Sequence, residues 1–150
     1  MWKEKLQQIK NMNEMFGEEI NDGATEHEIQ SFLEVLENSI NVEKIRPYIN
    51  LLKEVNGLEF NGFIFYGIDS NLLDNEPKQS INGFIDNNEV WHENEWQKKY
   101  VFLGDSNTSW YTYDEVVNKY YELDKPSGDI VQEFENIELL VDKLFGDALQ

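Results

Sequence analysis

The stretch Leu58-Glu59-Phe60-Asn61-Gly62-Phe63-Ile64-Phe65-Tyr66 marks the point at which the character of this sequence changes. Its central Asn-Gly pair lies between two short apolar runs, and this dipeptide favours a two-residue hairpin because both turn residues need positive φ. The pattern predicts antiparallel strands at 58–60 and 63–66. Helical periodicity dominates before this hairpin, and strand patterns dominate after it.

Helical spacing of apolar residues predicts four helices, at 2–16, 25–38, 47–55 and 136–145. The first would present one apolar face made of Trp2, Leu6, Ile9, Met12 and Phe16. Thr25 and Glu28 form a capping box at the start of the second, and Asn136 can cap the last. We expect the last helix to end before Gly146, because glycine commonly terminates helices.

Aromatic and β-branched residues predict further strands at 100–103, 110–113, 119–123 and 130–134. Between the two groups of strands, Asp86-Asn87-Asn88-Glu89 could cap a short helix or turn that carries Val90, Trp91 and Trp96. The chain has 150 residues, with 4 Trp, 7 Tyr and 9 Phe, which is enough material for one core. The order of elements predicts a single α+β domain: N-terminal helices, an antiparallel β-meander sheet, and a C-terminal helix packed on the sheet.

Charge restricts the classes of partner. Thirty acidic residues against 12 basic ones give a net charge of −18. Such a chain repels phosphate groups, so direct binding to nucleic acid or to an anionic membrane surface is close to excluded. A basic protein is the favoured partner instead.

Cysteine content and hydropathy bear on the location of the chain. The sequence contains no cysteine, which excludes disulfides and thiolate-ligated metals and suits the cytosol. Residues 1–16 distribute their charges at helical spacing, unlike a secretion signal. The longest apolar runs, such as 63–66, are far shorter than the roughly 20 residues that span a bilayer. We therefore expect a cytoplasmic protein that does not enter membranes, and the sequence leaves its oligomeric state open.

Several phrases of the sequence resemble one known family when their order and spacing are taken together. They are VNGLEFNGFIFYGID (55–69), NEVWHENEWQ (88–97), FLGDSN (102–107), SWYTYD (109–114) and LDKPSGDIVQEFE (123–135). From about Thr25 to Phe145 the chain resembles the SUKH superfamily, which includes the yeast cell-wall-synthesis regulators, and within it the YrhA-like bacterial branch. One departure is Arg46-Pro47, where a Leu-Pro pair is common in the family.

The resemblance implies a non-enzymatic binding domain, used in many bacteria as an immunity protein against toxins of interbacterial competition. The expected function is therefore an intracellular immunity protein that neutralises a basic toxin domain, such as a nuclease. A regulatory scaffold protein, as the yeast relatives suggest, is the alternative from a different class. A carboxylate-based hydrolase is a third.

Motifs for catalysis or cofactor binding are missing from the sequence. It contains no nucleophile elbow, phosphate-binding loop or dinucleotide fingerprint. His92 and Glu93 could ligate a divalent metal, but they lack the H-E-x-x-H spacing that places two imidazoles on one helix face. Asp105 begins a stretch like a calcium loop, yet Trp110 occupies the sixth position, where a sharp turn needs glycine. We expect no catalytic residue, no cofactor and no metal.

Acidic residues are concentrated in blocks. Residues 11–40 hold eight acids and no base, and residues 61–97 hold seven acids and one lysine. Solubility alone would account for this distribution. The rival hypothesis is a docking surface for a basic toxin, with acids that steer the partner and two tryptophans that anchor it. Its candidate residues are Asp69, Asp74, Glu76, Asp86, Glu89, Trp91, Glu93, Glu95 and Trp96.

Overall fold

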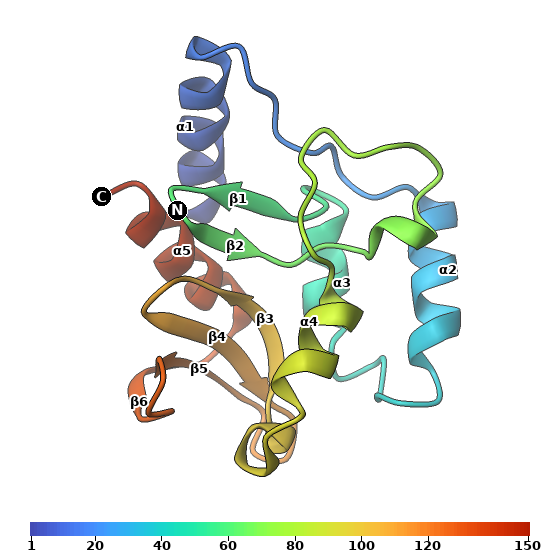
Figure 1. Cartoon of the computed structure of the whole chain (residues 1–150), viewed down its shortest axis with the longest axis vertical. Coiled ribbons are helices and arrows are strands. Elements are labelled where there is room, and N and C mark those ends of the chain that lie inside the picture. Colours follow the sequence, from blue (N-terminus) through green and yellow to red (C-terminus); the bar gives the residue numbers. More distant parts are fainter.

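The hairpin at Asn61-Gly62 forms as the sequence predicts, with φ of 53° and 82° at its two turn residues. It opens a six-stranded sheet in the computed structural model, which describes all 150 residues (Figure 1). The strands are β1 (Leu58–Phe60), β2 (Phe63–Phe65), β3 (Val101–Asp105), β4 (Ser109–Asp114), β5 (Lys119–Asp124) and β6 (Ile130–Phe134). Each strand pairs antiparallel with the next along the chain, so the sheet is a continuous meander.

Five α-helices and two 3₁₀ turns complete the fold. They are α1 (Trp2–Met15), α2 (Glu26–Leu36), α3 (Arg46–Leu52), η1 (Ser70–Leu72), α4 (Phe84–Trp91), η2 (Glu95–Lys99) and α5 (Ile137–Ala148). The capping box of Thr25 and Glu28 is present at α2, and the Asn136 side chain caps α5. The α+β class and the positions of the strands are therefore confirmed.

Three predictions about helix ends are wrong, since the helix expected at 47–55 also ends early, at Leu52. The last helix continues through Gly146 to Ala148, because Gly146 lies against the Lys5 side chain of α1 and packing there sustains the helix. The first helix ends at Met15, and Phe16 is 78% exposed. Its inward face ends with Asn13 instead, because Phe16 is the C-cap and lies beyond the last helical residue.

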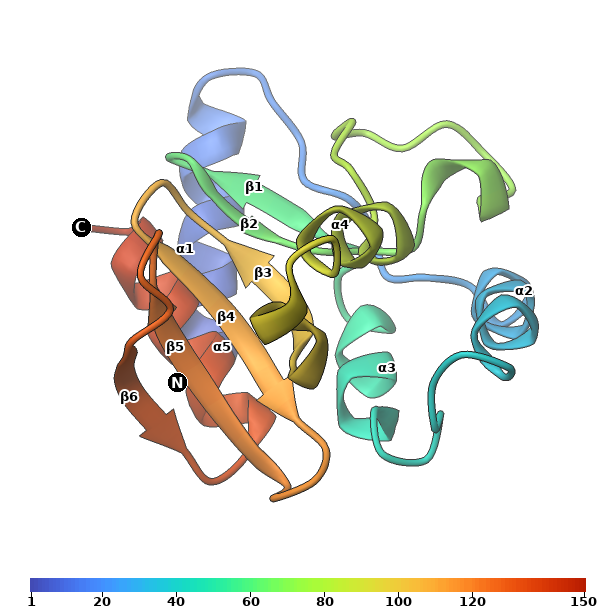
Figure 2. The same ribbon diagram turned by 60° about the horizontal axis from the view of Figure 1, so that its bottom comes forward.

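Helices cover the two faces of the sheet in different ways. Tyr111 on β4 points to α5, where its hydroxyl donates a hydrogen bond to Asp147. Helix α1 packs against α5 (Figures 1 and 2). Trp110, the residue before Tyr111, points to the opposite face, as alternation along a strand requires. There it packs against Trp91 and Trp96 from the connection between β2 and β3.

Side-chain amides close the sheet where strands have no neighbour. At the outer edge of β1, the Gln79 amide accepts a hydrogen bond from the Glu59 N–H and donates one to the Glu59 C=O, at 3.2 and 2.9 Å. The Asn88 amide of α4 likewise accepts a hydrogen bond from the Phe102 N–H on β3 and donates one to the Phe102 C=O, at 2.7 and 2.9 Å. The outer edge of β6 has no such partner.

Candidate protein-binding surface

The connection between β2 and β3 carries all nine residues that the sequence nominates for docking. It leaves the sheet after Tyr66, forms η1 and a polar loop, and returns through α4 and η2 (Figure 2). Phe84, the first residue of α4, anchors this helix, because its ring packs on Phe32 and Tyr48 at centroid distances of 5.6 and 5.2 Å. The position of this helix decides which of the nominated side chains face solvent.

Asp69 is not a docking residue, because it is only 3% exposed. Its carboxylate accepts hydrogen bonds from the backbone N–H groups of Ile85 and Asp86, at 2.8 and 3.0 Å. These are free donors of the first turn of α4, so Asp69 caps this helix from a distant position in the chain. Burial raises the pKa of the Asp69 carboxyl, although the same hydrogen bonds lower it in part.

Asp86, Glu89, Val90 and Glu93 form one exposed face, which we call the α4 acidic face. Asn88 points inward to β3, so Asp86, Glu89 and Val90 turn outward on the helix, and Glu93 is exposed in the turn just after it. None of the three carboxylates takes part in an ion pair, and Val90 between them is 52% exposed. Their charges therefore act on the solvent without compensation from neighbouring side chains.

An apolar groove of about 380 Å³ borders the α4 acidic face. It lies between α4 and the end of α2, and Glu89 and His92 stand at its margin. Five hydrophobic side chains line it: Leu36, Ile40, Phe84, Ile85 and Val101. The sequence prediction missed this groove, since Ile40 and Ile85 are far apart in the chain and carry no motif. Helical spacing could have grouped Val90 with its acidic neighbours, because 86, 89, 90 and 93 share one face.

The two nominated tryptophans differ in their surroundings. Trp91 is half-buried, its indole N–H donates to the Tyr66 hydroxyl at 3.0 Å, and its ring packs on Trp110 at 5.5 Å. These contacts hold the Trp91 ring against the molecule and leave only part of it for a partner. Trp96 is 42% exposed and also packs on Trp110, at 5.6 Å. Trp96 is thus the tryptophan that a partner can reach more fully.

Three further nominated carboxylates lie outside the α4 acidic face. Asp74 accepts hydrogen bonds from His27 and Thr25 at the start of α2, at 2.6 and 3.3 Å. Glu76 is exposed in the loop that follows η1. Glu95 forms an ion pair with Lys98 within η2, at 2.8 Å. The nominated residues therefore divide among the margin of α2, the α4 acidic face and η2.

Lys125 is a central residue of this region that no sequence pattern singled out. Its ammonium group donates to Asp105 and to the Ser106 carbonyl, at 3.0 and 2.7 Å. The same nitrogen lies 5.0 and 5.6 Å from the ring centroids of Trp91 and Trp110. Burial raises the pKa of the Asp105 carboxyl, and Lys125 lowers it in part. This contact ties the connection to the β5–β6 turn.

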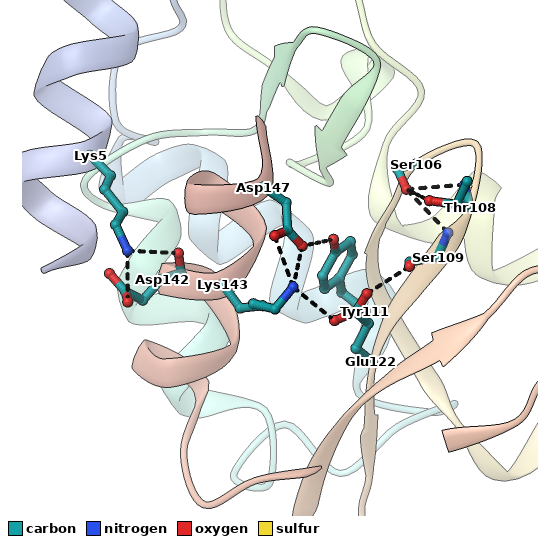
Figure 3. A network of polar contacts seen from close by, with 9 residues as sticks. All are labelled: Lys5, Ser106, Thr108, Ser109, Tyr111, Glu122, Asp142, Lys143 and Asp147. Carbon is teal, nitrogen blue, oxygen red and sulfur yellow. Dashed lines mark hydrogen bonds and ion pairs between the residues drawn. The ribbon is translucent and has the colours of Figure 1, made fainter. Parts of the chain in front are cut away.

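A second polar network, on the α5 side of the sheet, is the place to test the hydrolase hypothesis (Figure 3). Ser109 donates to Glu122 at 2.7 Å, and Lys143 pairs with Glu122 and Asp147 at 3.4 and 2.7 Å. Ser109 and Glu122 are both buried, and neither lines the groove between β6 and α5 that Lys143 borders. The serine hydroxyl is buried and engaged by Glu122, and the network joins the sheet to α5.

Burial by itself would disfavour the Lys143 charge. Its hydrogen bond to Asp147 and the charges of Glu122 and Asp147 outweigh that effect, so the pKa of Lys143 is raised. The lysine therefore stays charged and keeps both carboxylates paired, which is what a structural ion pair between α5 and the sheet requires.

His92 is bonded within the protein, and its surroundings bear on metal binding. The His92 Nε2 donates to the Tyr100 carbonyl at 2.7 Å, and the structure contains no cluster of three or more His, Asp or Glu side chains arranged to hold a metal ion. None of the helices combines the length and apolar character needed to cross a bilayer.

A scan against models of protein families and a search of curated proteins both found no match for this chain.

Proposed function

We propose that this chain is a non-enzymatic binding protein that captures a basic protein through the α4 acidic face. The observation that carries this proposal is the set of three exposed carboxylates, Asp86, Glu89 and Glu93, none of which has an ion-pair partner. Surfaces whose only purpose is solubility usually intersperse charges of both signs. Here one helix face presents a single sign beside an apolar groove, which suits an oppositely charged partner.

The two parts of this surface would contribute differently to binding. Unpaired carboxylates attract a basic partner over a distance and raise the association rate, because opposite fields steer the encounter. The apolar groove next to Glu89 can receive a hydrophobic side chain of the partner and so lengthen the lifetime of the complex. Trp96 would add to that lifetime if the partner extends over η2.

The biological role that we propose is immunity in interbacterial competition. It rests on the resemblance of the sequence to SUKH proteins and on the net charge of −18. The partner would be a basic toxin domain, and a nuclease fits because its phosphate-binding surface is itself basic. In this role the protein acts in the cytoplasm, where such a toxin reaches its target.

The first experiment tests the role. A basic reading frame next to the gene of this chain would be expressed in a sensitive host with and without the chain. We expect growth to stop with the basic protein alone and to recover when both are present. If growth does not recover although both proteins are soluble, the immunity role is contradicted. Stable binding without any toxicity of the partner would favour the regulatory scaffold instead.

The second experiment tests the surface, with kinetics measured on the same pair. Glu89→Lys combined with Glu93→Lys should lower the association rate about tenfold or more at low salt and much less at high salt, since the Debye length falls to about 8 Å at physiological ionic strength. Glu14→Lys combined with Glu18→Lys is the matched control, because both are exposed and unpaired and the change in net charge is equal. Equal effects of the two double variants would show that net charge, and not the α4 acidic face, drives binding.

A further inference from the structure

The free edge of β6 is a second place where this chain can meet another polypeptide, on the side of the sheet far from the α4 acidic face (Figure 2). β5 is the only strand next to β6, and no side chain or loop bonds to its outer edge. In an antiparallel ladder, every second residue of an edge strand directs its N–H and C=O away from its neighbour. β6 therefore offers backbone groups for a further strand, and Ile130 and Val131 on it are 57% and 55% exposed.

A groove of about 570 Å³ runs beside this edge, between β6 and α5. Gln132 and Phe134 form its strand side, and Leu139 and Gly146 belong to its helix side. A strand added to β6 would project alternate side chains toward the α5 face of the sheet, over this groove. Backbone pairing beside a side-chain groove is the arrangement by which edge strands recognise extended peptides.

Charge selects the occupant of this edge. Four carboxylates and two lysines line the groove, and each lysine already pairs with an α5 carboxylate, at 2.9 and 2.7 Å. Glu133 and Glu135 on the strand side share one further lysine, Lys119. The edge therefore keeps a negative excess. A second copy of this chain would bring the same carboxylates together, and each copy carries a charge of −18, so these charges favour a basic occupant over a second copy.

We propose that β6 accepts an extended, lysine- or arginine-rich segment of another protein as a seventh strand, with its basic side chains on the face that carries Glu133 and Glu135 and the alternate side chains over the groove. The register break between Glu122 and Leu123 places a bulge at Val131, so regular pairing is available from Gln132 onward. Three strand residues, Gln132 to Phe134, lie beyond the bulge, so the added strand would be short. This inference depends on neither the immunity role nor the α4 acidic face.

The test uses a synthetic peptide of alternating lysine and valine, seven residues long, and amide hydrogen exchange of the full chain followed by NMR. We expect the peptide to slow exchange about fivefold at the outward amides of β6, because they gain strand partners, and to leave β1 unchanged. A peptide of the same charge with proline at its centre should give no protection, since proline cannot continue a strand ladder.

A charge exchange gives the decisive arm. Glu133→Lys combined with Glu135→Lys should abolish protection by the lysine–valine peptide and create protection by a glutamate–valine peptide, because the backbone edge is retained. Three results would overturn the proposal. The proline peptide could protect the β6 amides as well as the parent peptide does, or a peptide could bind and leave these amides unprotected. Protection of β6 that rises with protein concentration in the absence of peptide would mean that a second copy occupies the edge. Circular dichroism establishes that the double variant is folded. The peptide experiments on the unaltered chain test the proposal even if the variant does not fold.

Discussion

The two outer edges of the sheet, β1 and β6, are treated in opposite ways. At β1 the side chain of Gln79 occupies the place of a further strand and satisfies both backbone groups of Glu59. Gln79 is itself held by Asn21, whose side chain also reaches the Asn56 carbonyl at 3.1 Å. At β6 no residue plays this part, and the strand instead presents glutamates.

The difference shows two ways of preventing unwanted strand pairing. A closed edge admits no strand of any kind, whereas an acidic edge repels copies of the same chain but still admits a basic strand. Because β1 is closed, any strand addition to this sheet is directed to one side. Asn88 extends the closed side inward, since it completes β3 at Phe102, where β2 offers no partner.

The largest expected effect belongs to Asn88→Ala. Both backbone groups of Phe102 would lose their partner in a fully buried position, and unsatisfied buried groups cost about 1–3 kcal/mol each. We expect the free energy of unfolding to fall by about 3 kcal/mol, measured by urea titration with tryptophan fluorescence. A loss below about 1 kcal/mol would mean that water replaces the amide at β3.

Gln79→Leu compares the two edges directly, with Gln132→Leu on β6 as the matched control. Gln79 makes two hydrogen bonds to a half-buried backbone, whereas the Gln132 side chain makes none. We expect a loss of about 2 kcal/mol at β1 and less than about 0.5 kcal/mol at β6 in the same urea titration. Equal losses would contradict the view that β1 alone is closed.

Asp69→Asn examines the anchor of α4, the helix that carries Asn88. An amide has one acceptor oxygen in place of two, so one N–H of the first turn of α4 loses its partner, and we expect a loss of about 1 kcal/mol.

The same variant isolates the pH dependence of Asp69. The pKa of Asp69 is raised in the folded state above its ordinary value of 3.8, so its titration favours folding below that value. This contribution is lost as the pH rises through the folded-state pKa. The stability difference between the unaltered chain and Asp69→Asn should therefore shrink as the pH rises above about 4, when both are titrated with urea. A difference that widens would mean that the pKa of Asp69 is lowered.

The smallest effect is expected at the open edge. Glu135→Gln removes a contact with Lys119 at 2.8 Å, but Glu135 is exposed, and exposed ion pairs contribute between about 0 and 1 kcal/mol. We expect the free energy of unfolding to change by less than about 0.5 kcal/mol. Thermal unfolding followed by circular dichroism is sufficient to measure it. A loss above about 1 kcal/mol would indicate that this pair fixes β6 in place and that the edge is less open than its geometry suggests.

Local signals made most of the fold predictable, and long-range contacts account for the rest. Asn61-Gly62 and the Thr25–Glu28 box act within a few residues, so their patterns were legible. Asp69 looked like a surface acid, because its bonds reach residues 16 and 17 positions away and nothing in the local pattern indicates burial. Gln79 and Asn88 likewise satisfy strands elsewhere in the chain. The acids of the α4 acidic face were nominated correctly as exposed, but the groove beside them needed the position of α2.

The tryptophan arrangement gives this protein a built-in optical reporter. The centroid of the Trp110 ring lies 5.5 Å from that of Trp91 and 5.6 Å from that of Trp96, whereas Trp2 belongs to α1 behind the sheet (Figure 2). Rings this close exchange excitation, so emission from the cluster should come mainly from its most solvent-accessible member, Trp96. A partner that covers η2 would then shift the emission to shorter wavelength. One fluorescence spectrum can thus report whether the surface around Trp96 is occupied.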